Sequence, residues 1–86
     1  MILDTTSYFK KLLIKKIKKN PQLEAKIKKQ IFLLLHDFQH PSLKTHKLTG
    51  DRKDQHSIWI ENNLRITYKI EGSIILLVDL ITHDEY

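Results

Sequence analysis

Apolar residues at helical spacing fill the first part of the chain. Between residues 6 and 19 they recur every three or four positions, as Phe9, Leu12, Leu13 and Ile17. Lysines occupy the other faces, so an amphipathic helix is predicted there, with Asp4 or Thr5 as its N-cap. Asn20 and Pro21 predict a new helix start, because Asn is a good N-cap and Pro is tolerated at the first helical position.

A second apolar stripe follows at once, again at helical spacing. It contains Leu23, Ile27, Ile31, Leu34, Leu35 and Phe38. The helix is expected to end before Pro41, which disfavours the α conformation at His40. Two helices joined so tightly predict an antiparallel hairpin with an apolar face that needs a cover.

The pattern changes to a period of two in the second half, which is typical of strands. Residues 57–61 and 64–70 alternate, and Asn62-Asn63 between them tolerate the positive φ of a tight hairpin turn. The apolar side of this hairpin consists of Ile58, Ile60, Leu64, Ile66, Tyr68 and Ile70. Glu71-Gly72 predicts the next turn, and residues 73–81 form the nearly continuous aliphatic run expected of a central strand.

These elements predict an α+β fold over residues 1–86 as a single domain. The helical hairpin packs on a mostly antiparallel sheet of three to four strands. Met1 to Leu3 is too short for its own pattern to decide, and a strand there would pair with the long last strand. Residues 39–55 are polar and irregular, with a short extended piece expected at residues 43–48. The chain has no cysteine, so packing must stabilise it without disulfides.

Charge adds a candidate partner to this picture. Fifteen Lys and Arg against ten Asp and Glu give a net charge of +5, and most lysines fall in the first third of the chain. Phosphate backbones attract such a surface without sequence specificity, although a solvated helix face has the same composition. The longest uncharged apolar run, Ile74 to Val78, is far shorter than the ~20 residues of a membrane span, so no membrane partner and a cytoplasmic location are expected.

Histidine is frequent, with five in the chain, and it exchanges protons near neutral pH. His36 and His40 have the i, i+4 spacing of a helical metal pair, but no Glu or Cys completes a set nearby, so no metal is expected. No nucleotide cofactor is expected either, because no glycine-rich phosphate loop is present. His83 follows the long apolar strand, and Tyr86 offers a ring for a nucleobase; a frayed tail is the alternative for both.

Arg65 and Trp59 are candidates for a binding surface. By alternation both point to the sheet face opposite the helices. There the guanidinium of Arg65 would clamp a phosphate bidentately, and the indole would stack on a base, as single-stranded RNA requires. The alternative is an exposed charge on a solvated sheet face.

Four segments in this order resemble the RelE superfamily of bacterial type II toxins, in particular its YafQ-like branch. They are Thr45-His46-Lys47-Leu48-Thr49-Gly50, Ser57-Ile58, Leu64-Arg65-Ile66-Thr67-Tyr68-Lys69-Ile70 and Leu77-Val78-Asp79-Leu80-Ile81-Thr82-His83-Asp84-Glu85. The resemblance covers nearly the whole chain and implies a strand, two helices and three strands in sequence. It also implies ribosome-dependent cleavage of mRNA in the A site, beside 16S rRNA, and neutralisation by a cognate antitoxin. Operator DNA would be contacted only indirectly, through the antitoxin.

The resemblance also implies roles for individual residues in a reaction without metal or cofactor. The ribose 2′-OH attacks the adjacent phosphate, with His46 as base, Arg65 stabilising the phosphorane and His83 as acid; the reverse assignment of the histidines is chemically open. Substrate contacts are expected from Trp59, His56, Tyr86 and Lys47. Ribosomal RNA contacts are expected from lysines of the first helix: Lys10, Lys11, Lys15, Lys18 and Lys19.

The chain departs from the family pattern in three places. Many relatives have an aromatic residue where His56 stands and a basic one at Trp59, and they have one residue more before the final aromatic. Two further hypotheses therefore stand beside the nuclease. One is a ParE-like gyrase inhibitor, which has no need of His46 and His83, and the other is an inactive paralogue that binds RNA or an antitoxin.

Overall fold

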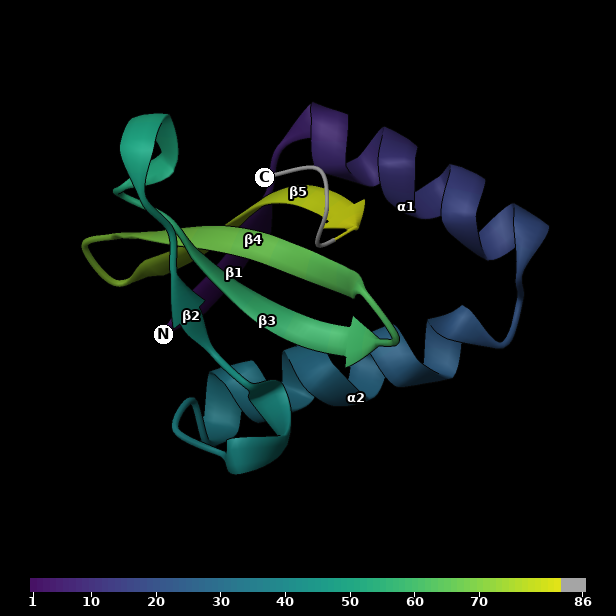
Figure 1. Ribbon diagram of the computed structural model, residues 1–86, viewed down its shortest axis with the longest axis horizontal. Helices are drawn as coiled ribbons and strands as arrows, with labels where there is room; N and C mark the ends of the chain where they lie inside the picture. Colours follow the sequence, from purple (N-terminus) through teal and green to yellow (C-terminus); the bar gives the residue numbers. More distant parts are fainter. Residues whose placement is uncertain (83–86) are drawn as a thin grey trace.

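The computed structural model describes residues 1–82, so the predictions for His83 and Tyr86 lie outside the described residues. Figure 1 shows the helices and strands in chain order. Their bounds are β1 (Ile2–Thr5), α1 (Ser7–Lys19), α2 (Leu23–His36), η1 (Pro41–Leu43), β2 (His46–Lys47), η2 (Gly50–Arg52), β3 (His56–Glu61), β4 (Leu64–Glu71) and β5 (Ile74–Thr82). The two η elements are short 3-10 helices.

The strands form one mixed sheet in the order β1-β5-β4-β3-β2. Strands β3, β4 and β5 are the predicted antiparallel meander. Strand β1 pairs with β5, the partner expected for a strand at the N-terminus, and this pairing is parallel. Strand β2 adds a short antiparallel edge within the piece predicted to be extended. Asn62 and Gly72 have φ of +47° and +62° in the two hairpin turns, which suits residue types that tolerate the left-handed region. The predicted α+β class is confirmed.

The helix ends differ from the prediction by a few residues. Thr6, and not Asp4 or Thr5, caps α1, because its Oγ1 accepts a hydrogen bond from the Phe9 N–H at 3.0 Å. Asn20 does not cap α2: its N–H donates to the carbonyl of Lys16, so it completes α1 instead. A turn must follow before α2 begins, with Gln22 at the N-cap position.

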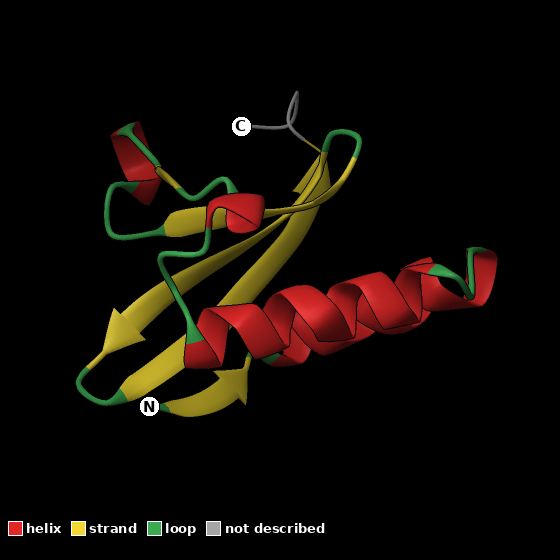
Figure 2. Cartoon of the chain, turned by 90° about the horizontal axis from the view of Figure 1, so that it is seen from below, coloured by secondary structure: helices red, strands yellow, loops and turns green. Residues whose placement is uncertain are grey.

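The hydrophobic core lies between the two helices and one face of the sheet. Figure 2 shows α2 on one side of the sheet and the short helix η2 on the other. The centre of the core consists of residues that are at most 2% exposed: Phe9, Ile27, Leu34, Leu43, Ile58, Ile60, Ile66, Ile75 and Leu77. Phe38, predicted to continue the apolar stripe of α2, lies beyond the helix end and is 62% exposed. Among the described residues no helix is long and apolar enough to cross a membrane.

The sheet face opposite the helices is covered at its centre. Arg65 is only 5% exposed and Thr67 is fully buried, so the face is not open around Arg65, and the alternative of an exposed charge on a solvated sheet face is wrong as well. The physical reason is the segment between α2 and β3, which crosses this face. The carbonyl of Lys44 accepts a hydrogen bond from Arg65, and Arg52 forms an ion pair with Asp79 of β5.

Ile66 tests the core directly, because its side chain on the central strand β4 is fully buried. Ile66→Ala is expected to lower the free energy of unfolding by about 2–5 kcal/mol, since lost burial and a residual cavity add. The measurement is urea unfolding followed by circular dichroism. Ile14→Ala is the matched control: its side chain is 67% exposed, so a change within about 0.5 kcal/mol is expected.

Candidate active site

A row of side chains crosses the sheet on the face away from the helices. His46 of β2 pairs with Ser57 of β3, Ser57 pairs with Thr67 of β4, and Thr67 pairs with Asp79 of β5. Direct cross-strand partners project to the same face, so four neighbouring strands each contribute one residue to this polar row. Ser57, Thr67 and Asp79 are buried, whereas His46 at the edge is exposed.

Arg65 projects from β4 onto the same face and bonds to the row. Its Nε donates to Ser57 Oγ at 2.8 Å, and its Nη2 donates to the Ser57 carbonyl at 3.3 Å and to the carbonyl of Lys44. A buried cation is tolerated only where hydrogen-bond acceptors compensate its lost hydration. These acceptors therefore fix the guanidinium beneath the surface, close to the strand that pairs with His46.

His46 and Arg65 are brought together through Ser57. This serine is the cross-strand partner of His46 and also the hydrogen-bond acceptor of Arg65. The face thus combines an exposed imidazole with a fixed cation. That pair of groups suits proton transfer beside a developing negative charge.

The other end of the row holds an ion pair that the sequence did not predict. Arg52 of η2 donates from Nη2 to Asp79 Oδ2 at 3.0 Å, and Asp79 Oδ1 accepts from the N–H of Leu80 at 2.8 Å. The only signal in the sequence was that Arg52 is one of just two arginines in a lysine-rich chain. It lies in an irregular segment, so no periodicity indicated where its side chain would point.

His56 and Lys47 lie on the opposite side of the sheet from this row. They pair with each other, and His56 also stacks on Tyr68 with ring centroids 5.6 Å apart. Because neighbours along a strand point to opposite faces, His56 cannot join Ser57 and His46. It lines a groove of about 490 Å³ with Phe38, Gln39, His40, Pro41, Lys44, Thr45, Tyr68 and Ile70.

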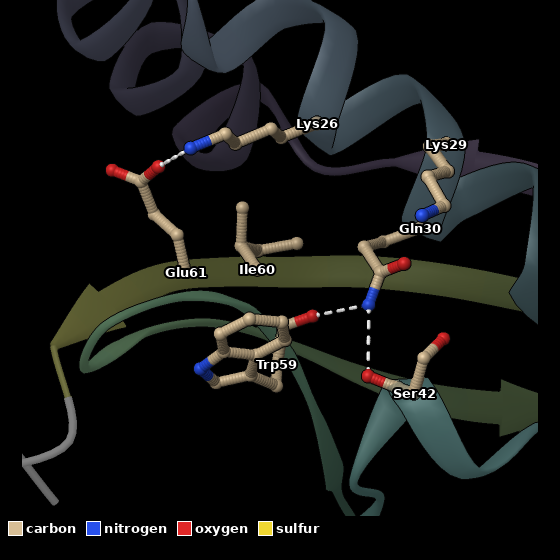
Figure 3. Close-up of a pocket in the computed structure, with 7 residues that line it drawn as sticks. All are labelled: Lys26, Lys29, Gln30, Ser42, Trp59, Ile60 and Glu61. Carbon is tan, nitrogen blue, oxygen red and sulfur yellow. Dashed lines mark hydrogen bonds and ion pairs between the residues drawn. The ribbon is translucent and has the colours of Figure 1, made fainter.

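Trp59 lines a separate pocket of about 240 Å³ between α2 and the edge of β3, seen in Figure 3. Gln30 bridges this gap, since its Nε2 donates to the carbonyls of Trp59 at 2.7 Å and Ser42 at 3.1 Å. The indole is half-buried, and its Nε1 donates to the carbonyl of Asn62. The ammonium of Lys44 lies 4.4 Å from the ring centroid, a cation–π contact. Trp59 is therefore a fixed aromatic surface beside the site.

The remaining candidates lie apart from the row. The α1 lysines proposed for ribosomal RNA are all exposed, and they stand on the helical layer behind the sheet: Lys10, Lys11, Lys15, Lys18 and Lys19. His40 caps η1, because its Nδ1 accepts from the N–H of Ser42 at 3.1 Å, and His36 packs on Phe32. Within residues 1–82 no group of three or more His, Cys, Asp or Glu is arranged to hold a metal ion.

Solved structures with this architecture are RelE-like bacterial toxins. YafQ from E. coli strain BL21(DE3) superposes with a TM-score of 0.80 at 19% identity, over 96% of this chain and 93% of that one. A YoeB/ParE toxin from Agrobacterium tumefaciens superposes with a TM-score of 0.83 at 20% identity, over 96% of this chain and 99% of that one. A chain of the E. coli DinJ–YafQ complex superposes with a TM-score of 0.77 at 20% identity, over 96% of this chain and 93% of that one. At such identities the likeness establishes the fold, which is that of the RelE-like toxins.

The family follows from the sequence match. The family model described as "Bacterial toxin of type II toxin-antitoxin system, YafQ" matches residues 1–86. The chain therefore belongs to the YafQ toxin family, and the predicted resemblance is confirmed. No curated protein matches the sequence significantly.

Ser57 and Thr67 allow a matched test of the buried row. Ser57→Ala removes the acceptor of Arg65 Nε, so a loss of about 1–3 kcal/mol in unfolding free energy is expected from the unsatisfied donor. Thr67 Oγ1 is buried without a hydrogen-bond partner, and Thr67→Val should therefore be neutral or slightly stabilising. Urea titration of both variants is the measurement. Equal losses would contradict the assignment of Ser57 as the acceptor of Arg65.

Tyr68 predicts how stability depends on alkaline pH. Burial raises the pKa of its hydroxyl above 10.0, because the phenolate would lose hydration. The folded state thus retains a proton that the unfolded state releases, and the unfolding free energy should fall as pH rises above about 10. Tyr68→Phe should make this decline shallower. Tyr8→Phe, on a ring that is 59% exposed, is the control that should leave it in place.

Proposed function

We propose that this member of the YafQ toxin family is a ribosome-dependent endoribonuclease that cleaves mRNA in the A site. The observation that carries the proposal is the junction of His46, Ser57 and Arg65 on one sheet face. A base and a fixed cation beside one another are what attack by a ribose hydroxyl on a phosphodiester requires. The RelE-like family resemblance supplies the reaction class.

In the proposed reaction the exposed imidazole of His46 accepts the proton of the ribose 2′-OH. The O2′–P bond forms, the P–O5′ bond breaks, and the products are a 2′,3′-cyclic phosphate and a 5′-hydroxyl end. The departing oxygen takes a proton from an acid, a role that the family resemblance gives to His83, outside the described residues. The reverse assignment of the two histidines satisfies the same proton balance.

Arg65 contributes charge from beneath the protein surface. The residue is 5% exposed, and its guanidinium is fixed by Ser57 and Lys44 before any substrate arrives. A charge that water screens poorly acts more strongly on a developing dianion than an exposed lysine would. Because the hydrogen bonds are already formed, no reorganisation is needed during the reaction.

Partners follow from family membership and from the surface. The solved DinJ–YafQ complexes support a cognate antitoxin for this chain as well, with operator DNA reached only through that antitoxin. The exposed lysines of α1 are proposed to bind ribosomal RNA, since phosphates attract such a surface. They lie on the helical layer, on the other side of the sheet from the row, whose exposed residue His46 is proposed to face the mRNA. Trp59, with Lys44 against its ring, is proposed to border the mRNA path.

Primer-extension mapping of cellular mRNA after induction tests the proposal. Wild type should produce cleavage within translated codons and stop growth. His46→Gln should reduce cleavage by about 10²–10⁴-fold, the usual contribution of a general base. His36→Gln is the matched control, because His36 is exposed at the end of α2 and outside the site.

The other hypotheses give different outcomes in the same cells. DNA damage without mRNA cleavage would replace the nuclease by a gyrase inhibitor. Neither effect, with growth unchanged, would leave an inactive protein that binds RNA or an antitoxin. Equal cleavage by wild type and His46→Gln would reject His46 as a catalytic residue.

A further inference from the structure

The ion pair between Arg52 and Asp79 differs from the others in the described part of the chain. Asp79 is 7% exposed in its side chain, whereas both partners of each other ion pair are at least 21% exposed. It also lies on the same sheet face as His46 and Arg65. A buried carboxylate needs compensation, and Arg52 with the N–H of Leu80 provides it.

We infer that Arg52, oriented by Asp79, binds a second phosphate of single-stranded RNA, next to the phosphate that is cleaved. This inference rests on the proposed function and adds a subsite to it. Arg52 would be the residue that contacts the RNA, and Asp79 would be a positioning residue that fixes its guanidinium.

The hydrogen-bonding capacity of Arg52 supports a ligand. A guanidinium has five N–H donors, and within the described residues one contact, to Asp79 Oδ2, is made. The side chain is 35% exposed, so its other donors can be reached from outside. A planar fork anchored at one nitrogen is suited to two oxygens of a phosphate, which the compact ammonium of lysine is not.

The distribution of arginine supports the same conclusion. The chain has fifteen lysines and arginines together, and only Arg52 and Arg65 are arginines. Both lie on the face that carries His46, and they come from unrelated elements, η2 and β4. All Lys and Arg positions in the two helices are lysines, so lysine is sufficient for general attraction to RNA. That attraction does not explain why positions 52 and 65 are arginine.

The spacing of the two anchors indicates two phosphates instead of one. Arg65 is bonded to Ser57 of β3, and Arg52 is bonded to Asp79 of β5. Strand β4 lies between them, so the anchors are separated by two strand spacings, about 10 Å. One phosphate held by Arg65 therefore leaves Arg52 for a neighbouring phosphate of the same strand.

A purely structural pin is the competing explanation, in which the ion pair only ties η2 to β5. The experiment separates the two by altering the RNA as well as the protein. A single-stranded oligoribonucleotide carries one 2′-deoxy sugar at the cleavage position, so that it cannot react. In a series, one flanking phosphate at a time is replaced by an uncharged methylphosphonate. The affinity of each RNA for the protein is measured by fluorescence anisotropy at a fixed salt concentration.

The expected result is a specific coupling between Arg52 and one flanking phosphate. One methylphosphonate should weaken binding by wild type about 10- to 100-fold, the value of a charge-assisted hydrogen-bonding pair. Arg52→Gln should weaken binding of the all-phosphate RNA by a similar factor and show no further loss with that methylphosphonate. Lys53→Gln removes the same charge one residue away on an exposed side chain and should retain the full methylphosphonate effect.

Asp79→Asn and urea unfolding complete the test. If Asp79 positions Arg52, Asp79→Asn should lower affinity for the all-phosphate RNA and weaken the methylphosphonate effect without abolishing it. If Arg52→Gln lowers stability yet keeps the same methylphosphonate profile as wild type, the inference is overturned and the pair is a structural pin. Failure of the proposed function is distinct from this, because it would appear as uncut mRNA on ribosomes with wild type while the binding profile remains measurable.

Discussion

The need to solvate one buried cation organises the face of the sheet that carries the proposed site. Arg65 lies in the middle of the sheet at 5% exposure, where an ion without acceptors would be strongly destabilising. Ser57 supplies its hydroxyl and carbonyl from β3, and Lys44 supplies a carbonyl from the connection after η1. Lys44 has a φ of +45°, a left-handed conformation that is uncommon outside glycine. The hydrogen bond from Arg65 to the Lys44 carbonyl joins this connection to the sheet.

The alternation of β3 and β4 then gives the two sides of the sheet different properties. Ile58 and Ile66 pair on the side of the helices and form the core, while Ser57 and Thr67 pair on the other side. His56 and Ser57 are neighbours in sequence, yet one stacks on Tyr68 and the other bonds to Arg65. A slip of one residue in register would exchange these environments.

Charge is divided between the two sides as well. The lysines of α1 are numerous and most are exposed, which suits attraction to phosphate without sequence preference. The arginines are few and held by neighbours, which suits contacts of defined geometry. The proposed function gives this division a meaning, because a ribosome-dependent nuclease would have to bind a large RNA surface and act on one phosphodiester.

The sequence by itself determined the elements, their order and the family, because helical and strand periodicities are local and the family segments are contiguous. It also put Arg65 on the side of the sheet away from the helices, since alternation along a strand is a local rule. It did not determine that this side is covered, that Arg52 reaches Asp79, or that His56 is separated from His46. Those features depend on how residues 39–55 cross the sheet and on cross-strand register. Such contacts join residues far apart in the chain through an irregular segment. An irregular segment has no periodicity from which the partner of a side chain could be predicted.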